Sequence, residues 1–270
     1  MKLRFRHLFL CFALTAALCL PAHAARQVTV IIDGTPLNTA TVSCRIYGGS
    51  TYVPLTDFAA AMGTTAVRWD GSAATVSGNG ITLTAPKNQC YLTANERCFY
   101  LPQGVKLVEG RTMVPVTALA AAYGLGVRWD GAASTVHLTS GGAETFSGYD
   151  PDALYWLSRI ISAESRGEPL TGQIAVGNVV LNRVASPEFP GSIYTVIFDT
   201  NYGLQFEPVG NGTIWQDPAP SSVLAAKMVL EGANVVGDSL YFYNPTLSQS
   251  TWFDANRPYY TTIGCHRFYL

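Results

Sequence analysis

Histidine is scarce in this sequence, and two of its four histidines lie within the first 24 residues. Beyond them only His137 and His266 remain. A zinc centre takes about three His, Cys or carboxylate ligands, and copper needs several imidazole or thiolate ligands. A cysteine nucleophile needs a histidine brought to it from elsewhere in the chain, but Cys265 is the direct neighbour of His266 at the C-terminus. We therefore expect no metal, no cofactor and no cysteine peptidase chemistry.

Charged residues are also few, at 13%, and a long apolar run occurs only at the N-terminus. Residues 1–24 place basic side chains before an apolar run from Leu8 to Leu20, followed by small residues at Ala22 and Ala24. This pattern predicts a secretory signal peptide, because the run is too short to span a bilayer. The alternative is an uncleaved membrane anchor.

Cleavage after residue 24 would remove three basic residues and no acidic one, which changes the formal net charge from −1 to −4. Such a balance argues against a nucleic-acid partner, which requires a basic face. We expect a secreted protein that is extracellular or associated with a cell wall, with no membrane attachment after cleavage.

Four cysteines remain beyond the signal segment, an even number in an oxidising compartment. Cys90 and Cys98 flank a segment that reads as a hairpin around Ala94-Asn95. One interpretation is a cross-strand disulfide between these two cysteines, and the other is a pair of free thiols. Cys44 and Cys265 lie in different halves of the chain, and no pairing is predicted for them.

An internal repeat organises the first half of the chain. A Val-Pro pair, an alanine-rich segment and the string Val-Arg-Trp-Asp-Gly occur twice, with offsets of 61 residues at Pro54 and Pro115 and of 60 at Trp69 and Trp129. The residue before proline favours extended backbone, a glycine ends each alanine-rich segment, and Asp-Gly favours a tight turn. Each copy is therefore predicted to form a strand, a short helix and a β-hairpin.

This repeat resembles the copper-amine-oxidase N-terminal-like stalk domain of secreted bacterial proteins over residues 27–140. We interpret Trp69, Trp129 and His137 as core or strand-face packing residues, with ligand binding as the alternative. The resemblance implies a role in spacing, or in docking to the wall or to a protein partner. The small and polar residues 141–150 predict a linker.

Residues 150–166 have the periodicity of an amphipathic helix whose N-cap is Asp150 or Asp152. Glu164 continues its apolar face and lies in the last turn. The partial negative charge of a helix C-terminus and the loss of water both disfavour an ionised carboxylate. We therefore expect a raised pKa for Glu164, which would suit it to protonate the leaving oxygen of a glycosidic bond.

The alternative for Glu164 is a structural pairing with Arg159 or Arg166. A second helix follows and contains Asn178, which either lines a cleft or bonds buried backbone. Aromatic loops come next, around Gln205-Phe206, Trp215, Tyr241–Pro245 and Trp252. Aromatic rings with amide neighbours are typical of carbohydrate sites, although such loops also form small hydrophobic cores.

The motifs of the second half resemble the SleB/CwlJ-type cell-wall hydrolases, the spore-cortex-lytic enzymes and their relatives, over about residues 152–270. They are Glu164–Pro169, Gly172–Val184, Phe189-Pro190, Gln205-Phe206, Tyr241–Pro245 and Ile263–Phe268. The resemblance implies an α+β chain of two domains. A duplicated strand–helix–hairpin stalk precedes a mainly α, lysozyme-like domain of the lytic transglycosylase type at 151–270.

By the same resemblance, Glu164 is the general acid, and the candidate substrate-binding residues are Gln205, Phe206, Tyr243, Asn244, Glu168 and Asn178. The implied substrate is the glycan strand of peptidoglycan, cut between N-acetylmuramic acid and N-acetylglucosamine in wall remodelling or spore cortex lysis. No second acid is equally well placed, since Glu168 lies past the helix end and Glu207 lies in a loop. This favours one catalytic carboxylate and a 1,6-anhydro product, with simple hydrolysis as an alternative. A different class of alternative is a non-catalytic wall-binding or structural protein.

Overall fold

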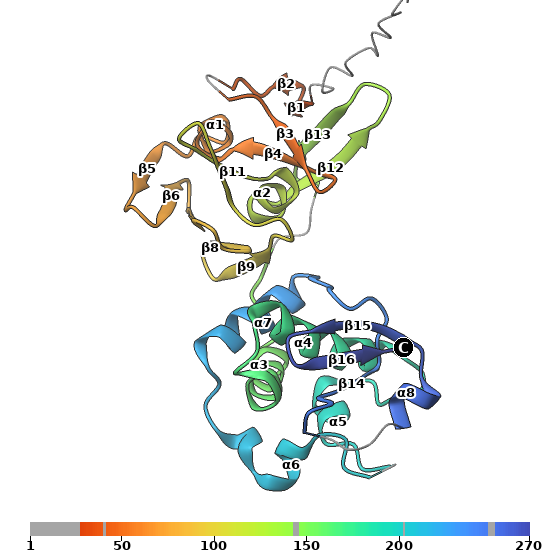
Figure 1. Cartoon of the computed structure of the whole chain (residues 1–270). Coiled ribbons are helices and arrows are strands. Elements are labelled where there is room, and N and C mark those ends of the chain that lie inside the picture. The colour runs from red at the N-terminus through yellow and green to blue at the C-terminus, as the bar shows by residue number, and fades with distance from the viewer. Residues whose placement is uncertain (1–27, 40–41, 143–145, 202, 248–251) are drawn as a thin grey trace, which may run out of the picture.

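The computed structural model describes residues 28–39, 42–142, 146–201, 203–247 and 252–270. The expected signal segment lies outside these ranges. The chain forms a strand-rich N-terminal domain and a C-terminal domain built around helices (Figure 1). This α+β architecture of two domains was predicted from the sequence. Among the described helices, none has the length and apolar character needed to cross a bilayer.

The N-terminal domain consists of short strands and two helices that place the two copies of the repeat side by side. Its elements are β1 (Thr29–Ile32), β2 (Thr35–Pro36), β3 (Arg45–Tyr47), β4 (Ser50–Pro54), α1 (Leu55–Ala61), β5 (Ala66–Trp69), β6 (Ala73–Gly78), β7 (Ile81–Pro86), β8 (Tyr91–Ala94), β9 (Arg97–Tyr100), β10 (Lys106–Val108), β11 (Arg111–Pro115), α2 (Val116–Tyr123), β12 (Leu125–Asp130) and β13 (Thr135–Ser140).

The two copies meet through their Val-Pro strands. Strands β4 and β11 pair antiparallel, with Val53 opposite Val114, at the centre of the sheet β10-β11-β4-β3. Helices α1 and α2 follow these strands directly and bury Phe58 and Leu119 in one common core. Each copy then ends in the predicted hairpin, β5–β6 in the first and β12–β13 in the second. The strand–helix–hairpin repeat is thus confirmed.

The two repeat tryptophans are not core residues. Trp69 and Trp129 lie on β5 and β12, which are edge strands of their sheets, and their side chains are 48% and 51% exposed. Of the interpretation as core or strand-face residues, the core part is therefore wrong, while both tryptophans do lie on strands. His137 on β13 is half-buried.

The structure also contradicts the interpretation of a Cys90–Cys98 disulfide, because all four described cysteines are free thiols. The predicted hairpin exists, but its turn is Asn95-Glu96, one residue later than expected. Cys98 consequently faces Thr93 in the register of β8 and β9. Because Cys90 lies three residues before Thr93, the alternation of strand side chains directs Cys90 and Cys98 to opposite faces.

The C-terminal domain contains a helical core with a small sheet against it. Its elements are α3 (Pro151–Ser165), α4 (Leu170–Ala185), α5 (Ile193–Ile197), α6 (Glu207–Asn211), the 3₁₀ turn η1 (Thr213–Trp215), α7 (Pro220–Leu230), β14 (Tyr241–Tyr243), α8 (Trp252–Asn256), β15 (Tyr259–Ile263) and β16 (His266–Tyr269). The strand order of the sheet is β14-β16-β15.

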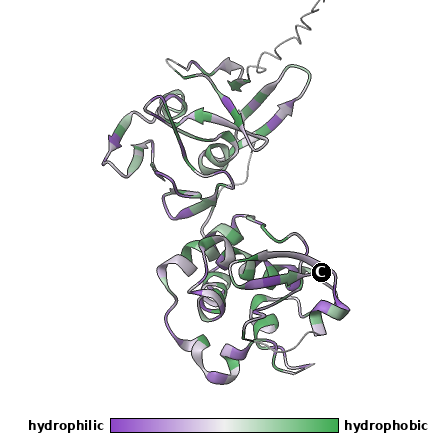
Figure 2. Cartoon of the chain, viewed as in Figure 1, coloured by the Kyte–Doolittle hydropathy of each residue, from purple (hydrophilic) through white to green (hydrophobic). Residues whose placement is uncertain are grey.

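Helix α3 begins where Asp150 accepts a hydrogen bond from the Ala153 amide at 2.9 Å, which confirms an aspartate N-cap. Helices α3, α4 and α7 pack against one another, and Gly177 of α4 allows the close approach, since a Cβ there would meet Ile161 at 2.8 Å and Val229 at 3.0 Å. Both domains show hydrophobic and hydrophilic residues interspersed along their elements (Figure 2). The packing of α3 on α4 fixes the last turn of α3, where Glu164 lies.

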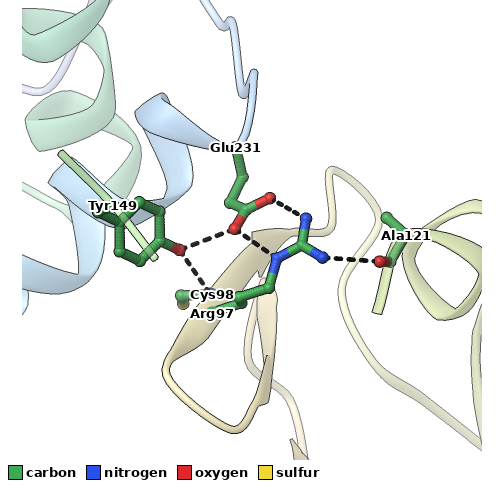
Figure 3. A network of polar contacts seen from close by, with 5 residues as sticks. All are labelled: Arg97, Cys98, Ala121, Tyr149 and Glu231. Carbon is green, nitrogen blue, oxygen red and sulfur yellow. Dashed lines mark hydrogen bonds and ion pairs between the residues drawn. The ribbon is translucent and has the colours of Figure 1, made fainter. Parts of the chain in front are cut away.

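The hairpin β8–β9 joins the two domains. Cys98 and the half-buried Tyr91 and Tyr100 belong to the same hydrophobic cluster as the core of the C-terminal domain. Around them, Arg97 forms an ion pair with Glu231 at the end of α7, and the Tyr149 hydroxyl donates to the same carboxylate at 2.8 Å (Figure 3). The hairpin lies between the two copies of the repeat in the sequence, and it is not part of either copy.

Candidate active site

A cleft of about 1200 Å³ opens in the C-terminal domain. Residues from the end of α3, from α4, from the segment leading into α6, and from β14, α8 and β16 meet there. Its lining includes Glu164, Arg183, Glu188, Gln205, Phe206, Glu207, Thr213, Tyr243, Asn244 and His266. Helices α3 and α4 form a rigid wall, and the loop before α6 and strand β14 provide most of the amide and aromatic groups.

Glu164 is half-buried in the wall of this cleft, in the last turn of α3. Within the described residues its carboxyl group has no hydrogen-bond or ion-pair partner. The pKa of Glu164 is raised from 4.5 to about 7, chiefly because burial disfavours the ionised form and secondly because the Glu207 carboxylate is near. The Arg183 guanidinium opposes this shift. The prediction of a raised pKa is confirmed, and a pKa of about 7 keeps a large fraction of the Glu164 carboxyl groups protonated at neutral pH.

The alternative of a structural ion pair with a neighbouring arginine is not what the structure shows. Arg159 pairs with Asp217 at 3.1 Å. Arg166 donates to the backbone and hydroxyl oxygens of Ser162 on its own helix. Both guanidinium groups are thus engaged away from Glu164, which leaves the carboxyl group free for a ligand.

Arg183 is a cleft residue that the sequence analysis did not single out. Its guanidinium lies over the rings of Phe189, Phe206 and Tyr241, with distances of 4.8, 5.1 and 5.7 Å to the ring centroids. Its Nε donates to the Leu240 carbonyl oxygen at 2.8 Å. Burial lowers the pKa of Arg183 to about 10, so it remains a cation at neutral pH. The sequence signal that could have identified Arg183 is a single arginine on the buried face of an otherwise apolar helix.

Four of the candidate substrate-binding residues line the cleft together with Glu164. Gln205 donates to the Gly203 carbonyl oxygen at 3.2 Å, and Phe206 is buried beneath Arg183. The Tyr243 hydroxyl donates to Asp254 at 2.6 Å, and Asn244 accepts from the Thr246 amide at 2.9 Å. Their aromatic faces and their remaining amide groups therefore border the space in front of Glu164.

The other two candidates, Asn178 and Glu168, are not among the residues that line the cleft. Asn178 is buried in α4, donates to the Ala233 carbonyl oxygen at 2.6 Å and accepts from the Val235 amide at 3.0 Å. Glu168 accepts from the Cys265 amide at 2.8 Å. Both side chains bind backbone groups in this structure, so contact of either residue with the substrate stays a prediction.

Two further features of the cleft were missed or set aside. Glu207, which the sequence places in a loop, is the first residue of α6 and provides a second carboxylate in the cleft. His266 is buried, and its Nδ1 atom has no hydrogen-bond partner among the described residues. Burial lowers the pKa of His266, so this imidazole is neutral at pH 7.

Each half of the chain matches the model of a known protein family. Residues 31–138 match the model of the copper amine oxidase N-terminal domain, and residues 167–269 match that of the cell wall hydrolase family. Residues 31–138 contain a single histidine, His137, and three cysteines, Cys44, Cys90 and Cys98. No group of three or more His, Cys, Asp or Glu that could hold a metal occurs in the part of the chain that the structure describes.

Curated relatives share the second half. A spore cortex-lytic enzyme of Bacillus cereus is 35% identical over 127 residues, which is 47% of this chain and 48% of that protein. The spore cortex-lytic enzyme of Bacillus subtilis strain 168 is 35% identical over 121 residues, or 45% of this chain and 38% of that protein. The chain thus spans less than half the length of these curated relatives.

Two solved structures are also similar to this chain. The catalytic domain of the germination-specific lytic transglycosylase SleB from Bacillus anthracis is 33% identical, with a TM-score of 0.42, and covers 47% of this chain and all of that one. The catalytic domain of the Bacillus cereus SleB protein is 35% identical, with a TM-score of 0.41, and covers 48% of this chain and all of that one. By its matches to the two family models, the chain carries a copper amine oxidase N-terminal domain at residues 31–138 and a domain of the cell wall hydrolase family at residues 167–269.

Proposed function

We propose that this chain is a secreted enzyme that cleaves the glycan strands of peptidoglycan, at the β-1,4 bond between N-acetylmuramic acid and N-acetylglucosamine. The observation that carries the proposal is Glu164, whose carboxyl group lies in the wall of a large cleft, has no partner among the described residues and has its pKa raised to about 7. The names of the curated relatives, spore cortex-lytic enzymes, support the same substrate and a role in spore cortex lysis or wall remodelling.

The chemistry requires one carboxyl group that acts twice. Glu164 first donates its proton to the bridging oxygen, and the glycosidic C–O bond breaks with its electron pair on the leaving sugar. The ionised Glu164 then takes the proton from the 6-hydroxyl of the muramic residue, whose oxygen bonds to the anomeric carbon and closes a 1,6-anhydro ring. Glu164 is protonated again at the end, so the residue acts as acid and then as base without an external reactant.

The surroundings of Glu164 fit both steps. Burial and Glu207 favour the protonated acid before cleavage, and the Arg183 cation stabilises the carboxylate between the two proton transfers. Arg183 is held by three rings and one carbonyl oxygen, so its charge needs little reorganisation when Glu164 ionises. Gln205, Tyr243 and Asn244 would orient the acetamido group of the bound sugar, since all three border the cleft.

Simple hydrolysis is a second candidate, and Glu207 favours it. Inverting and retaining glycosidases place two carboxyl groups across the scissile bond, one as acid and one as base or nucleophile. Glu207 is exposed and lines the same cleft as Glu164, so it could activate a water molecule. The two outcomes differ in product, because hydrolysis leaves a reducing end and transglycosylation leaves a 1,6-anhydro end.

The test uses purified peptidoglycan and two proteins, the wild type and Glu164→Gln. We expect a loss of turbidity with the wild type and none with Glu164→Gln, because the amide retains the shape of the side chain but donates no proton to the bridging oxygen. Mass spectrometry of the released fragments then assigns anhydro or reducing ends. Equal turbidity loss with both proteins would reject Glu164 as the acid, and no loss with either would favour the non-catalytic alternative.

We also infer that the N-terminal domain docks onto the wall. Both copies of the repeat expose apolar side chains at equivalent positions, namely the pairs Ile46/Leu107, Val67/Val127 and Trp69/Trp129, all between 47% and 55% exposed. Two equivalent surfaces suit a polymer that repeats, because two weak contacts to one strand add in avidity. Replacing both tryptophans by alanine should release the Glu164→Gln protein from sedimented peptidoglycan, and unchanged sedimentation would reject the docking.

A further inference from the structure

Five aromatic rings form a continuous cluster on the C-terminal domain, outside the cleft. Trp156 on α3 lies at its centre, with ring centroids 4.9 Å from Tyr155, 5.2 Å from Tyr194, 5.2 Å from Phe198 and 5.6 Å from Trp215. Tyr194 and Phe198 come from α5 and the residue after it, and Trp215 closes the turn η1. We call these five residues the aromatic platform.

The platform is only partly covered. Tyr155, Tyr194 and Trp215 are 42%, 50% and 60% exposed, while Trp156 and Phe198 beneath them are half-buried. A set of adjoining exposed rings is costly in water, and such patches usually mark a binding surface. The rings support one another by edge-to-face contacts, so their orientation is set before any ligand arrives.

The platform adjoins the cleft at the turn η1 and lies farther from it along α3. In the turn η1, Thr213 lines the cleft and Trp215, two residues later, belongs to the platform. On α3, Tyr155 precedes Glu164 by nine residues, which is about 13 Å along the helix axis and about two and a half turns, so the two side chains leave opposite faces of the helix. A ligand that occupies both places must therefore be extended, and a short fragment bound at Glu164 would not reach the platform.

Polar groups lie between the platform and the end of α3. Tyr155, Arg159 and Arg166 recur at four- and seven-residue steps and so share one face of the helix. The Arg159 guanidinium is 3.8 Å from the Tyr155 ring centroid and is paired with Asp217. Arg166 is exposed, and among the described residues its hydrogen bonds go to uncharged groups, the oxygens of Ser162 and Gln216. Arg166 therefore retains an uncompensated positive charge on this surface.

We propose that the aromatic platform binds the same glycan strand as the cleft, several sugar units away from the bond that is cut. The apolar faces of β-1,4-linked pyranose rings stack on Tyr194 and Trp215, and Arg166 pairs with a carboxylate of the muramic residues or their stem peptides. This inference rests on the proposed function, because it takes the glycan strand as the ligand of Glu164. Its consequence is a preference for long strands over short fragments.

The experiment measures binding with no turnover, in the Glu164→Gln protein. The probes are long glycan strands stripped of their peptides and, separately, a purified tetrasaccharide of the same polymer. The test variants add Trp215→Ala, Tyr194→Ala or both, and Trp215→Phe restores a ring. Tyr259→Ala is the matched control, because Tyr259 is 58% exposed on β15 and belongs neither to the platform nor to the cleft lining.

We expect the double substitution to weaken binding of long strands about tenfold, with each single change giving part of the loss. Trp215→Phe should recover most of the affinity, and Tyr259→Ala and tetrasaccharide binding should be unchanged. Unaltered binding of long strands by the double variant overturns the proposal. So does an equal loss for the tetrasaccharide, or a wild-type dimer in sedimentation that Trp215→Ala converts to a monomer, since the platform would then be a contact between copies.

The two proposals fail in different ways. If the wild type cuts peptidoglycan but the platform substitutions leave long-strand binding unchanged, the proposed function stands and the platform does not. If Glu164→Gln proves as active as the wild type, while long strands still depend on Trp215 and Tyr194, the platform stands as a glycan-binding surface and the role of Glu164 is lost.

Discussion

The Arg97 guanidinium lies against the Glu231 carboxylate across the boundary between the two domains, with Nη2 2.6 Å and Nε 2.8 Å from its two oxygens (Figure 3). Arg97 also donates to the Ala121 carbonyl oxygen of α2 at 2.8 Å. One side chain of the β8–β9 hairpin thus connects the end of α7 to the second copy of the repeat. The side chains of Arg97 and Glu231 are 19% and 9% exposed, so the pair is shielded from water.

Removing one partner of this pair should loosen the two domains. Among the described residues, Arg97→Ala leaves the buried Glu231 carboxylate with the Tyr149 hydroxyl as its one donor, and we expect a loss of about 2 kcal/mol in the free energy of unfolding. Urea denaturation and limited proteolysis between the domains measure the effect. The matched control is Arg45→Ala, because Arg45 and Glu109 form a pair whose side chains are 45% and 63% exposed. Exposed pairs contribute at most about 1 kcal/mol, so equal losses for the two variants would contradict a special role for Arg97.

The pH dependence of cleavage should respond to Glu207. The Glu207 charge helps raise the pKa of Glu164 to about 7, and Glu164 must be protonated to start the reaction. Glu207→Gln should therefore lower the pKa of Glu164 and move the alkaline fall of kcat/KM to lower pH. Glu188→Gln is the control, because Glu188 lines the same cleft but is not among the groups that shift Glu164. A profile that moves equally with both substitutions would indicate a general charge effect.

Stability should depend on the protonation of Glu164 in a defined pH window. Its pKa is raised from 4.5 to about 7 in the folded protein, so the folded state binds the proton more tightly than the unfolded state does. The resulting stabilisation is fully present below pH 4.5 and is lost progressively as the pH rises to about 7. Glu164→Gln has no such ionisation and should flatten this part of the profile, with a difference of at most about 3 kcal/mol between the two limits. Denaturation midpoints measured from pH 4 to pH 8 would show the same slope in both proteins if Glu164 did not carry the effect.

The sequence predicts the architecture better than it predicts which polar side chains meet the cleft. The Val-Pro strands and the Asp-Gly hairpins depend on local backbone preferences, so both copies of the repeat were recognised. The raised pKa of Glu164 also followed from its place on an apolar helix face. Burial, the largest cause of the shift, was anticipated, but the contribution of Glu207 was not, because no periodicity locates the segment that brings Glu207 to the cleft.

The sequence did not predict the exposure of the repeat tryptophans or the register of the β8–β9 hairpin. Trp69 and Trp129 have the side chains of core residues but lie on edge strands, and edge position depends on the order of strands in the sheet. A shift of one residue in the turn at Asn95-Glu96 placed Cys98 opposite Thr93 and away from Cys90. Both errors arise because strand order and strand register depend on tertiary contacts, which the local sequence does not determine.

Asn178 and Gln205 provide a final contrast between a structural and a ligand-binding amide. Asn178→Ala removes two hydrogen bonds to buried backbone groups, so we expect the free energy of unfolding to fall by about 2 kcal/mol. Its kcat and KM per folded molecule should stay near those of the wild type, because Asn178 is not part of the cleft lining. Gln205→Ala should do the reverse, with little change in stability and a KM raised by up to about tenfold, since Gln205 keeps hydrogen-bonding capacity toward the cleft. Chemical denaturation and steady-state kinetics on soluble glycan fragments separate the two effects. A raised KM for Asn178→Ala in a fully folded protein would restore it to the substrate-binding residues and require an opening of α4 that this structure does not show.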